Sequence, residues 1–246
     1  MEQVTGTYLD LGGQELKQMV RAALSWLRQH QATINALNVF PVPDGDTGTN
    51  MTLTMTSAWN EIEHLADDNI GEIAAKVAYG ALMGARGNSG VILSQIWRGV
   101  ARGLDHHTRM NVQGLSEAMQ KASETAYKGV VKPVEGTILT VIREVAEEAQ
   151  VAAEQTNDVV LMLERLVQRA KAAEARTPAL LPVLRQAGVV DSGGQGLVII
   201  LEGMLRSLQG LSVDEIERPV QMVDLSTVDV HAPGMSDNEM LEFDAN

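Results

Sequence analysis

Apolar residues recur every three or four positions along most of this 246-residue chain, the spacing of helices with one buried face. Between Glu15 and Leu37, for example, Leu16, Met19 and Val20 fall on one side. Strand-like alternation does not persist, and prolines and glycines separate the periodic stretches. The pattern predicts an all-α protein with helices at residues 15–37, 50–65, 70–83, 89–103, 112–130, 137–154, 158–175, 178–186 and 194–208.

The composition agrees with close helix packing. Aromatic residues make up only 3% of the chain, while the small and flexible apolar residues that favour helices over sheets are plentiful. The absence of cysteine excludes disulfides, a thiolate nucleophile and a zinc-thiolate site, and it agrees with a reducing cytoplasm. Neither a signal peptide nor an apolar run long enough to span a bilayer is present. We therefore expect a cytoplasmic protein that does not insert into membranes.

The formal charge of −13 is unevenly distributed. Residues 211–246 carry nine acidic residues and one arginine, a charge of −8, which leaves −5 for the rest. Helical periodicity also fades after residue 208. We expect residues 9–208 to form one ligand-binding domain, and residues 209–246 to be an acidic linker or tail that leads to a second domain outside this sequence. An acidic body without a basic stripe does not favour nucleic acid, and an anionic ligand would need bound cations.

The most informative segment is Asn38–Met51, which reads NVFPVPDGDTGTNM. Asp44 and Asp46 are separated by a single glycine, so a tight turn can direct both carboxylates at one hard cation such as Mg²⁺. The polar residues that follow precede a helical pattern, and a helix N-terminus favours phosphate. An ordinary surface turn is the alternative interpretation. An EF-hand is excluded, because Met55 stands where that loop requires a bidentate glutamate.

Two further glycine-rich segments precede predicted helices. The segment at 84–95 reads GARGNSGVILSQ, and its glycines allow backbone N–H groups to approach an anion. It lacks the Gly-Lys pair of a P-loop. The segment at 190–196 reads VDSGGQG, in which Asp191 can cap a helix, bind a ligand, or do both. Thr137 follows a weaker loop of similar composition. For each loop a simple helix connection remains possible.

Taken together and in this order, the three motifs resemble the ATP-binding domain of bacterial fatty acid kinases, which is related to the nucleotide-binding subunit of dihydroxyacetone kinase. The resemblance implies an antiparallel barrel of eight helices with ATP at one mouth. It also implies that Asp44 and Asp46 are the catalytic residues and hold two Mg²⁺ ions, with Asn38 as a neutral third ligand. The nucleotide-binding residues that it implies are Thr47, Gly48, Thr49, Asn50, Gly87, Asn88, Ser89, Gly90, Thr137, Asp191 and Gly193.

The acceptor implied by this resemblance is a fatty acid carboxylate, presented by a separate fatty-acid-binding carrier protein. A carboxylate is already ionised at neutral pH, so its attack on the γ-phosphorus needs charge neutralisation and alignment but no general base. The product would be an acyl phosphate. Because the family has further domains that form homodimers and receive the carrier, we expect residues 1–246 to bind MgATP but to transfer phosphate poorly alone.

Three other interpretations remain open at this stage. The first is a dihydroxyacetone-type kinase subunit. The second takes the Asp-Gly-Asp-Thr segment as the nucleophile and acid of a haloacid-dehalogenase-type phosphotransferase, which would require a preceding strand in a doubly wound sheet. The third is a nucleotide-binding scaffold that retains the barrel but does not transfer phosphate.

Overall fold

The computed structural model describes residues 8–213, which contain ten helices and no strand. An isolated antiparallel bridge pairs Leu11 with Met110. The all-α prediction is therefore confirmed. In chain order, the helices are α1 (Gly13–Ala36), α2 (Thr47–Ile62), α3 (Ile70–Met83), α4 (Gly87–Gly103), α5 (Val112–Lys128), α6 (Ile138–Ala153), α7 (Val159–Ala175), α8 (Thr177–Leu180), α9 (Pro182–Ala187) and α10 (Ser192–Leu208).

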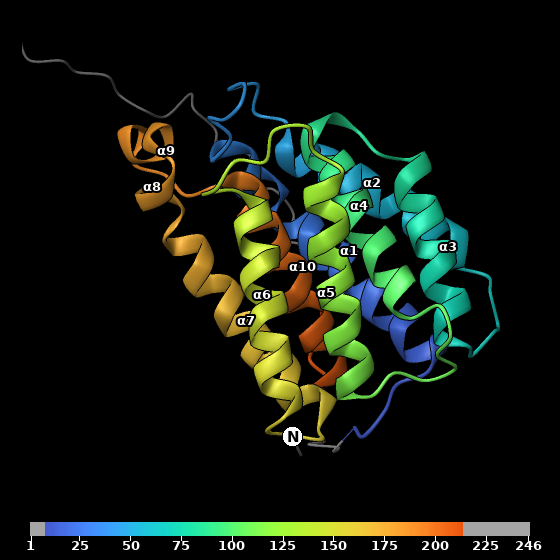
Figure 1. The fold of residues 1–246 in the computed structure, drawn as a ribbon. Helices are drawn as coiled ribbons and strands as arrows, with labels where there is room; N and C mark the ends of the chain where they lie inside the picture. The colour runs from blue at the N-terminus through green and yellow to red at the C-terminus, as the bar shows by residue number, and fades with distance from the viewer. Residues whose placement is uncertain (1–7, 214–246) are drawn as a thin grey trace, which may run out of the picture. The chain divides into compact units, whose positions relative to one another are not determined.

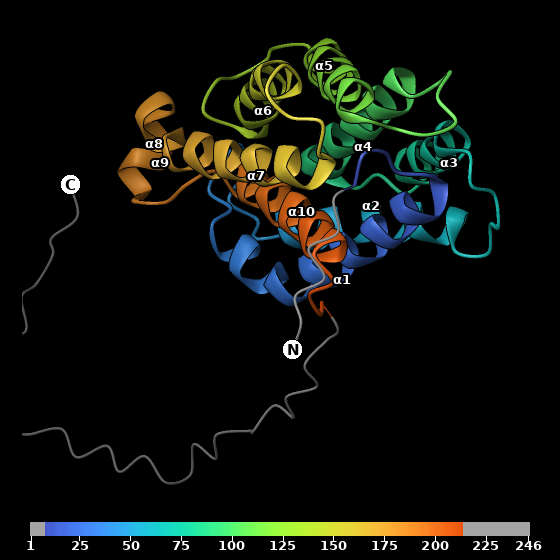
Figure 2. The ribbon, with the colours of Figure 1, turned by 90° about the horizontal axis from the view of Figure 1, so that it is seen from below.

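Eight of these helices form a closed ring (Figures 1 and 2). From α1 to α7 each helix packs on the next, α7 packs on α10, and α10 packs back on α1. The connections are short, so successive helices run antiparallel. The predicted eight-helix barrel is thus confirmed. Helices α8 and α9 lie between α7 and α10 in the chain and are not members of the ring.

Aliphatic and methionine side chains fill the inside of the ring. Small residues let neighbouring helices approach closely: a Cβ on Gly203 of α10 would lie 2.6 Å from the Cα of Ala23 on α1. The same holds between α4 and α5, where a Cβ on Gly103 would lie 2.5 Å from the Cα of Ala118. Close backbone packing of this kind explains why so few aromatic residues are needed to fill the core.

The predicted helix at 178–186 is wrong in one respect, because Pro182 divides it into α8 and α9. Proline has no N–H to donate and disfavours the helical conformation in the residue before it. Accordingly, Leu181 is extended, with φ −119° and ψ 108°.

Four other helices begin two or three residues earlier than predicted, at Gly13, Thr47, Gly87 and Ser192. The expected acidic tail lies largely outside the described residues, apart from residues 209–213. None of the helices in residues 8–213 has the length and apolarity that crossing a bilayer requires.

Candidate nucleotide and metal site

A cleft of about 700 Å³ opens at one end of the ring. The N-terminal ends of α2, α4, α6 and α10 line it, because alternate members of an antiparallel ring begin at the same end. Unpaired backbone N–H groups and the positive ends of the helix dipoles therefore converge on one space. The predicted site residues that line this cleft are Asn38, Asp44, Asp46, Thr47, Gly87, Asn88, Ser89, Thr137, Asp191 and Gly193.

Four predicted residues do not line the cleft and instead pack behind it. Thr49 accepts side-chain hydrogen bonds from Gln31 and Asn35 of α1 through its hydroxyl. Gly48 faces the same helix, and Gly90 lies against Thr54 of α2. The Asn50 side chain packs against Gly87 and so connects the starts of α2 and α4.

The loop between α1 and α2 presents two carboxylates. Gly45 lies in the left-handed region at φ 67°, which glycine adopts without strain, so the chain can turn between Asp44 and Asp46. Asp46 is the N-cap of α2, yet its side chain makes no capping hydrogen bond. Within residues 8–213, neither carboxylate has a hydrogen-bond or ion-pair partner. Both are therefore free to coordinate a ligand from the cleft.

Asn38 is buried beneath this loop with 7% of its surface exposed. Its amide oxygen accepts hydrogen bonds from the backbone N–H groups of Asp46 and Thr47, both at 3.2 Å, and from the Thr47 hydroxyl at 2.8 Å. Its amide nitrogen donates to the carbonyl of Val42 at 2.9 Å. These contacts hold the loop closed and favour a positioning role for Asn38. Coordination of a metal by Asn38 stays a prediction.

The start of α4 offers an anion-binding surface. Gly87 has φ 57°, and the N-cap Arg86 makes no side-chain capping bond, so the first N–H groups of the helix stay available. The Ser89 hydroxyl oxygen is buried and has no hydrogen-bond partner within residues 8–213. Ser89 lines the cleft, so its unpartnered hydroxyl is available to form a hydrogen bond with a ligand there.

Asp191 caps α10, as one of its two predicted roles requires. Its Oδ2 accepts a hydrogen bond from the Gly194 N–H at 2.7 Å, and only 5% of the residue is exposed. Burial raises its pKa to about 6, although hydrogen bonds from the N–H groups of Gly194 and Ile138 oppose this shift. Beside it, the Ser192 hydroxyl donates to Thr47 at 3.1 Å and so joins α10 to α2. A ligand-binding role for Asp191 stays a prediction.

Thr137 caps α6, where its hydroxyl accepts a hydrogen bond from the Leu139 N–H at 3.3 Å and donates one to the Val134 carbonyl at 2.7 Å.

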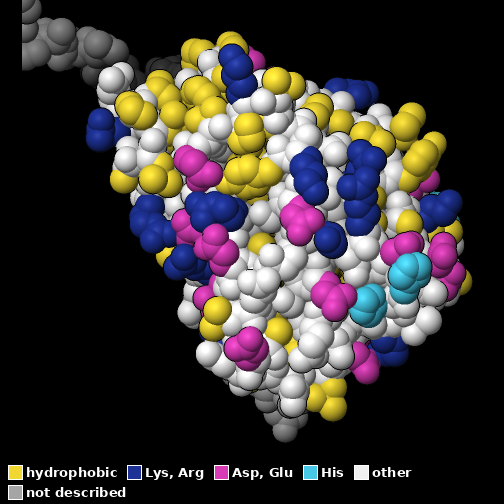
Figure 3. All heavy atoms as spheres, viewed as in Figure 1, with side chains coloured by type: hydrophobic (Ala, Val, Ile, Leu, Met, Phe, Trp, Pro, Cys, Tyr) yellow, Lys and Arg dark blue, Asp and Glu magenta, His cyan; other side chains and the backbone are white. Residues whose placement is uncertain are grey.

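Sequence reasoning missed Lys132, which also lines the cleft, because a lysine in a loop without a motif carries no signal. It also missed the apolar rim. Figure 3 shows hydrophobic side chains gathered at this end of the protein, and Val42, Val91 and Val131 line the cleft with 57%, 45% and 97% of their surface exposed.

Within residues 8–213, no group of three or more His, Cys, Asp or Glu side chains is placed to hold a metal ion. Asp44 and Asp46 are two carboxylates only. A metal bound there would need oxygen atoms from its ligand or from water to complete its coordination, as Mg²⁺ bound to phosphates commonly does.

Residues 41–206 match the DAK2 domain family, and the chain therefore belongs to that family. It is 44% identical over 235 residues to Protein YloV of Bacillus subtilis (strain 168), covering 95% of this chain and 42% of that protein. It is also 44% identical over 214 residues to an uncharacterised protein of Staphylococcus aureus (strain USA300), covering 87% of this chain and 38% of that protein. The chain thus spans about two fifths of the length of these relatives.

Among solved structures, the fold is similar to that of the dihydroxyacetone kinase from C. freundii in complex with AMP-PNP and Mg²⁺. The TM-score is 0.58 at 18% identity, covering 78% of this chain and 33% of that one. The native form of the same kinase gives a TM-score of 0.57 at 18% identity, covering 84% and 37%. At this identity, the likeness establishes a shared fold. A doubly wound sheet, as the dehalogenase-type interpretation requires, is wrong for residues 8–213.

Proposed function

We propose that this chain is the MgATP-binding domain of a phosphotransferase. The observation that carries the proposal is the convergence of four helix N-termini and two unpartnered carboxylates on one cleft. Helix N-termini favour phosphate, whereas carboxylates repel it unless cations lie between them. A site with both features suits a polyphosphate that arrives with a bound metal. The kinase of similar fold was solved with AMP-PNP and Mg²⁺, which agrees with this assignment.

In this proposal, Asp44 and Asp46 would hold two Mg²⁺ ions, whose positive charge would offset the negative charge of the phosphates. Thr47 and residues 87–89 lie against the phosphates, and residues 48–50 and Gly90 support them from behind. Thr137, Asp191 and Gly193 lie toward the nucleoside. The unpaired carboxylates and the unpartnered Ser89 hydroxyl fit this distribution. We expect direct contacts from the residues that line the cleft and support from those packed behind it.

We further propose that the acceptor is a fatty acid carboxylate. One carboxylate oxygen forms the new bond to the γ-phosphorus, the bond from that phosphorus to the β,γ-bridging oxygen breaks, and its electron pair leaves with ADP. The product is an acyl phosphate, and no proton is transferred. This chemistry suits the cleft, because it needs alignment and charge neutralisation, which helix N-termini and carboxylate-bound cations can supply. The exposed valines of the rim suit an apolar acyl group or the protein that presents it.

The remaining elements of the proposal concern parts outside this chain. Because its relatives are more than twice as long, we propose that further domains complete the enzyme. We also propose that a separate fatty-acid-binding carrier protein presents the acceptor. Those domains would also form any homodimer. We place the protein in the cytoplasm. Residues 1–246 alone should then bind nucleotide and transfer little phosphate.

Calorimetry tests the nucleotide site. The Asp44→Asn/Asp46→Asn double variant should lose at least about tenfold in ATP affinity with Mg²⁺ present, since it removes the metal ligands and leaves the fold intact. Removal of Mg²⁺ should lower the ATP affinity of the unaltered chain to a similar extent. Glu61→Gln/Glu154→Gln, which makes the same charge change at exposed residues outside the cleft, should bind normally. Equal affinity of both double variants would contradict the proposed site.

The acceptor needs a separate assay. The longer protein, supplied with MgATP and a fatty acid on its carrier, should form a hydroxylamine-reactive acyl phosphate. Phosphorylation of dihydroxyacetone in its place would identify the other kinase type. Nucleotide binding without transfer to either acceptor would indicate a scaffold.

A further inference from the structure

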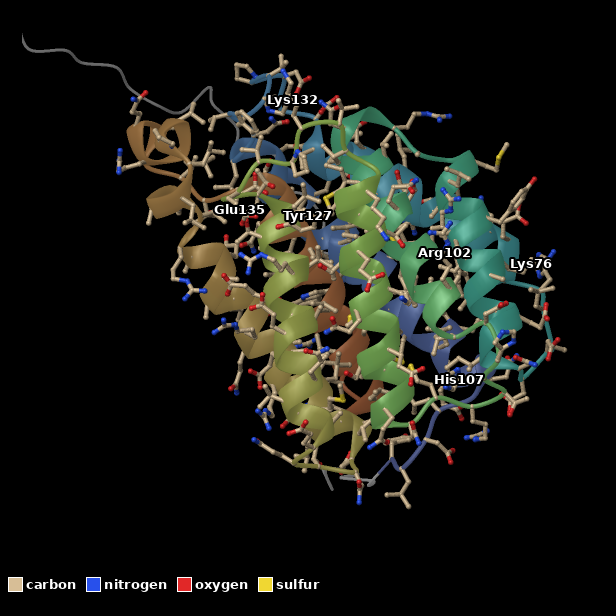
Figure 4. The ribbon with its side chains drawn as sticks, in the orientation of Figure 1. Lys76, Arg102, His107, Tyr127, Lys132 and Glu135 are labelled. Carbon is tan, nitrogen blue, oxygen red and sulfur yellow. The ribbon has the colours of Figure 1, made fainter. Side chains whose placement is uncertain are left out.

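We propose that Lys132 contacts the phosphoryl group in transfer and the anionic acceptor that approaches it. This assignment rests on the proposed function and adds a residue that no motif in the sequence indicated. Figure 4 shows Lys132 on the loop between α5 and α6, at the same end of the protein as the cleft. Lys132 lines the cleft together with Asp44, Asp46 and Asp191.

The charges of the cleft create a need for such a residue. Its described lining carries three carboxylates, and Lys132 is its one lysine or arginine. An ATP tetra-anion and an ionised acceptor add further negative charge, which two divalent ions on Asp44 and Asp46 do not fully balance. The γ-phosphoryl group and an attacking carboxylate repel each other most strongly as they meet. A cation at that point therefore stabilises the transition state more than the bound nucleotide.

The loop that bears Lys132 is fixed at its base. Glu135 accepts hydrogen bonds from the Tyr127 hydroxyl and the Thr140 hydroxyl, both at 2.7 Å, and from Arg143 at 3.2 Å. In Figure 4, Tyr127 and Glu135 lie together below Lys132. The N–H of Gly136 also donates to the Thr140 hydroxyl at 2.8 Å. These contacts join the loop to α5 and α6 and set where it crosses the cleft.

At the tip of the loop, by contrast, the lysine is free. Lys132 is exposed, and no residue in 8–213 forms an ion pair or hydrogen bond with it. A lysine carries a compact charge on a flexible stem, so it can follow a phosphoryl group as it moves between two oxygens. The ends of the loop are held in place, while the ammonium group at its tip is unpaired. We expect this arrangement of a residue that contacts its ligand only after the ligand has bound in the cleft.

The test uses the whole 246-residue chain and does not depend on the acceptor. MgADP with fluoroaluminate mimics the phosphoryl group in transfer, whereas MgADP alone does not. We expect Lys132→Met to weaken binding of the fluoroaluminate complex by about 30-fold or more, and binding of MgADP by less than about threefold. Lys132→Arg should recover part of the loss. Lys128→Met, at the exposed end of α5 and outside the cleft, is the matched control and should bind both complexes normally.

Two negative results have different meanings. If Lys132→Met binds both complexes as tightly as the unaltered chain, Lys132 is an ordinary surface residue and the assignment is overturned, while the proposed nucleotide site stands. If the unaltered chain itself fails to bind MgADP, the proposed function is wrong and the assignment fails with it. A loss shared by Lys128→Met would show a general charge effect and would also overturn the specific role of Lys132.

Discussion

The amide oxygen of Asn38 accepts a hydrogen bond from the Thr47 hydroxyl at 2.8 Å, across the loop that bears the two aspartates. Two backbone N–H groups donate to the same oxygen. An amide oxygen has two lone pairs, so three donors already saturate it. These three hydrogen bonds connect Asn38, just after α1, to the first turn of α2. The loop that bears the two carboxylates is therefore held at both of its ends.

Substitutions of Asn38 should separate positioning from metal coordination. Asn38→Ala removes the acceptor of three donors and should lower the free energy of unfolding by about 1–3 kcal/mol, together with MgATP affinity. Asn38→Asp keeps an acceptor oxygen and adds a charge. If Asn38 only positions the loop, Asn38→Asp should bind Mg²⁺ no more tightly than the unaltered chain in calorimetry. Tighter Mg²⁺ binding by Asn38→Asp would instead support a direct ligand at this position.

Ser89→Ala should weaken nucleotide binding without destabilising the free protein. The hydroxyl has no partner in residues 8–213, so its removal loses no hydrogen bond of the unliganded state. A hydrogen bond to a charged phosphate contributes about 1.5–3 kcal/mol, so MgATP affinity should fall by about tenfold or more. Thermal unfolding and calorimetry measure the two effects. Ser94→Ala, on the same helix, loses a bond to the Val91 carbonyl, but Ser94 itself does not line the cleft, so this variant should leave affinity unchanged.

Two glycines in the left-handed region allow a matched comparison. Gly188 has φ 69°, and no atom lies within 4 Å of the position that a Cβ would take, so Gly188→Ala should cost only backbone strain of about 1 kcal/mol. Gly87 has φ 57°, and a Cβ there would collide with the Asn50 side chain. Gly87→Ala should therefore cost more and also reduce MgATP affinity, because it disturbs the start of α4. Denaturant unfolding with calorimetry checks both. Equal behaviour of the two variants would refute the special role of the Gly87 turn.

The sequence predicted the helices well where apolar residues recur at helical spacing, and the loops that it grouped together line one cleft. It placed the starts of α1, α2, α4 and α10 too late. Glycine, serine and threonine were read as loop residues, yet the first helical turn tolerates them because its N–H groups lack intrahelical partners. Closure of the ring by α1 and α10 could not be read from periodicity, since it depends on close packing between residues far apart in the chain, such as Ala23 and Gly203.

Lys132 and Asn38 show what local patterns leave out. A single loop lysine has no spacing to detect, and only the fold shows that Lys132 lines a cleft together with three carboxylates from other segments. Asn38 is the first residue of the segment that bears the two aspartates, and the family resemblance implies a metal ligand at this position. Its hydrogen bonds to residues eight and nine positions later depend on how the loop folds back, which the sequence does not state.

Glu174 and Asp191 are both buried, Asp191 in the wall of the cleft, and the charge of Asp191 acts on Glu174, so stability should depend on pH. Burial, and secondarily the charge of Asp191, raises the pKa of Glu174 to about 7 from its ordinary value of 4.5. A raised carboxyl pKa means that the folded state holds its proton more tightly than the unfolded state does. The free energy of unfolding should therefore fall as the pH rises from about 4.5 to 7, and the full penalty should persist above pH 7.

Glu174→Gln removes the ionisation and should stabilise the protein at pH 8 by roughly 1–3 kcal/mol, while leaving stability at pH 4.5 nearly unchanged. Denaturant unfolding at pH 4.5, 6 and 8 measures the difference. The exposed Glu154→Gln variant should show no such trend with pH. Because Glu174 has one carboxylate oxygen without a partner in residues 8–213, the amide should replace it at little cost. A Glu174→Gln variant less stable than the unaltered chain at pH 8 would mean that the ionised carboxylate makes a stabilising contact.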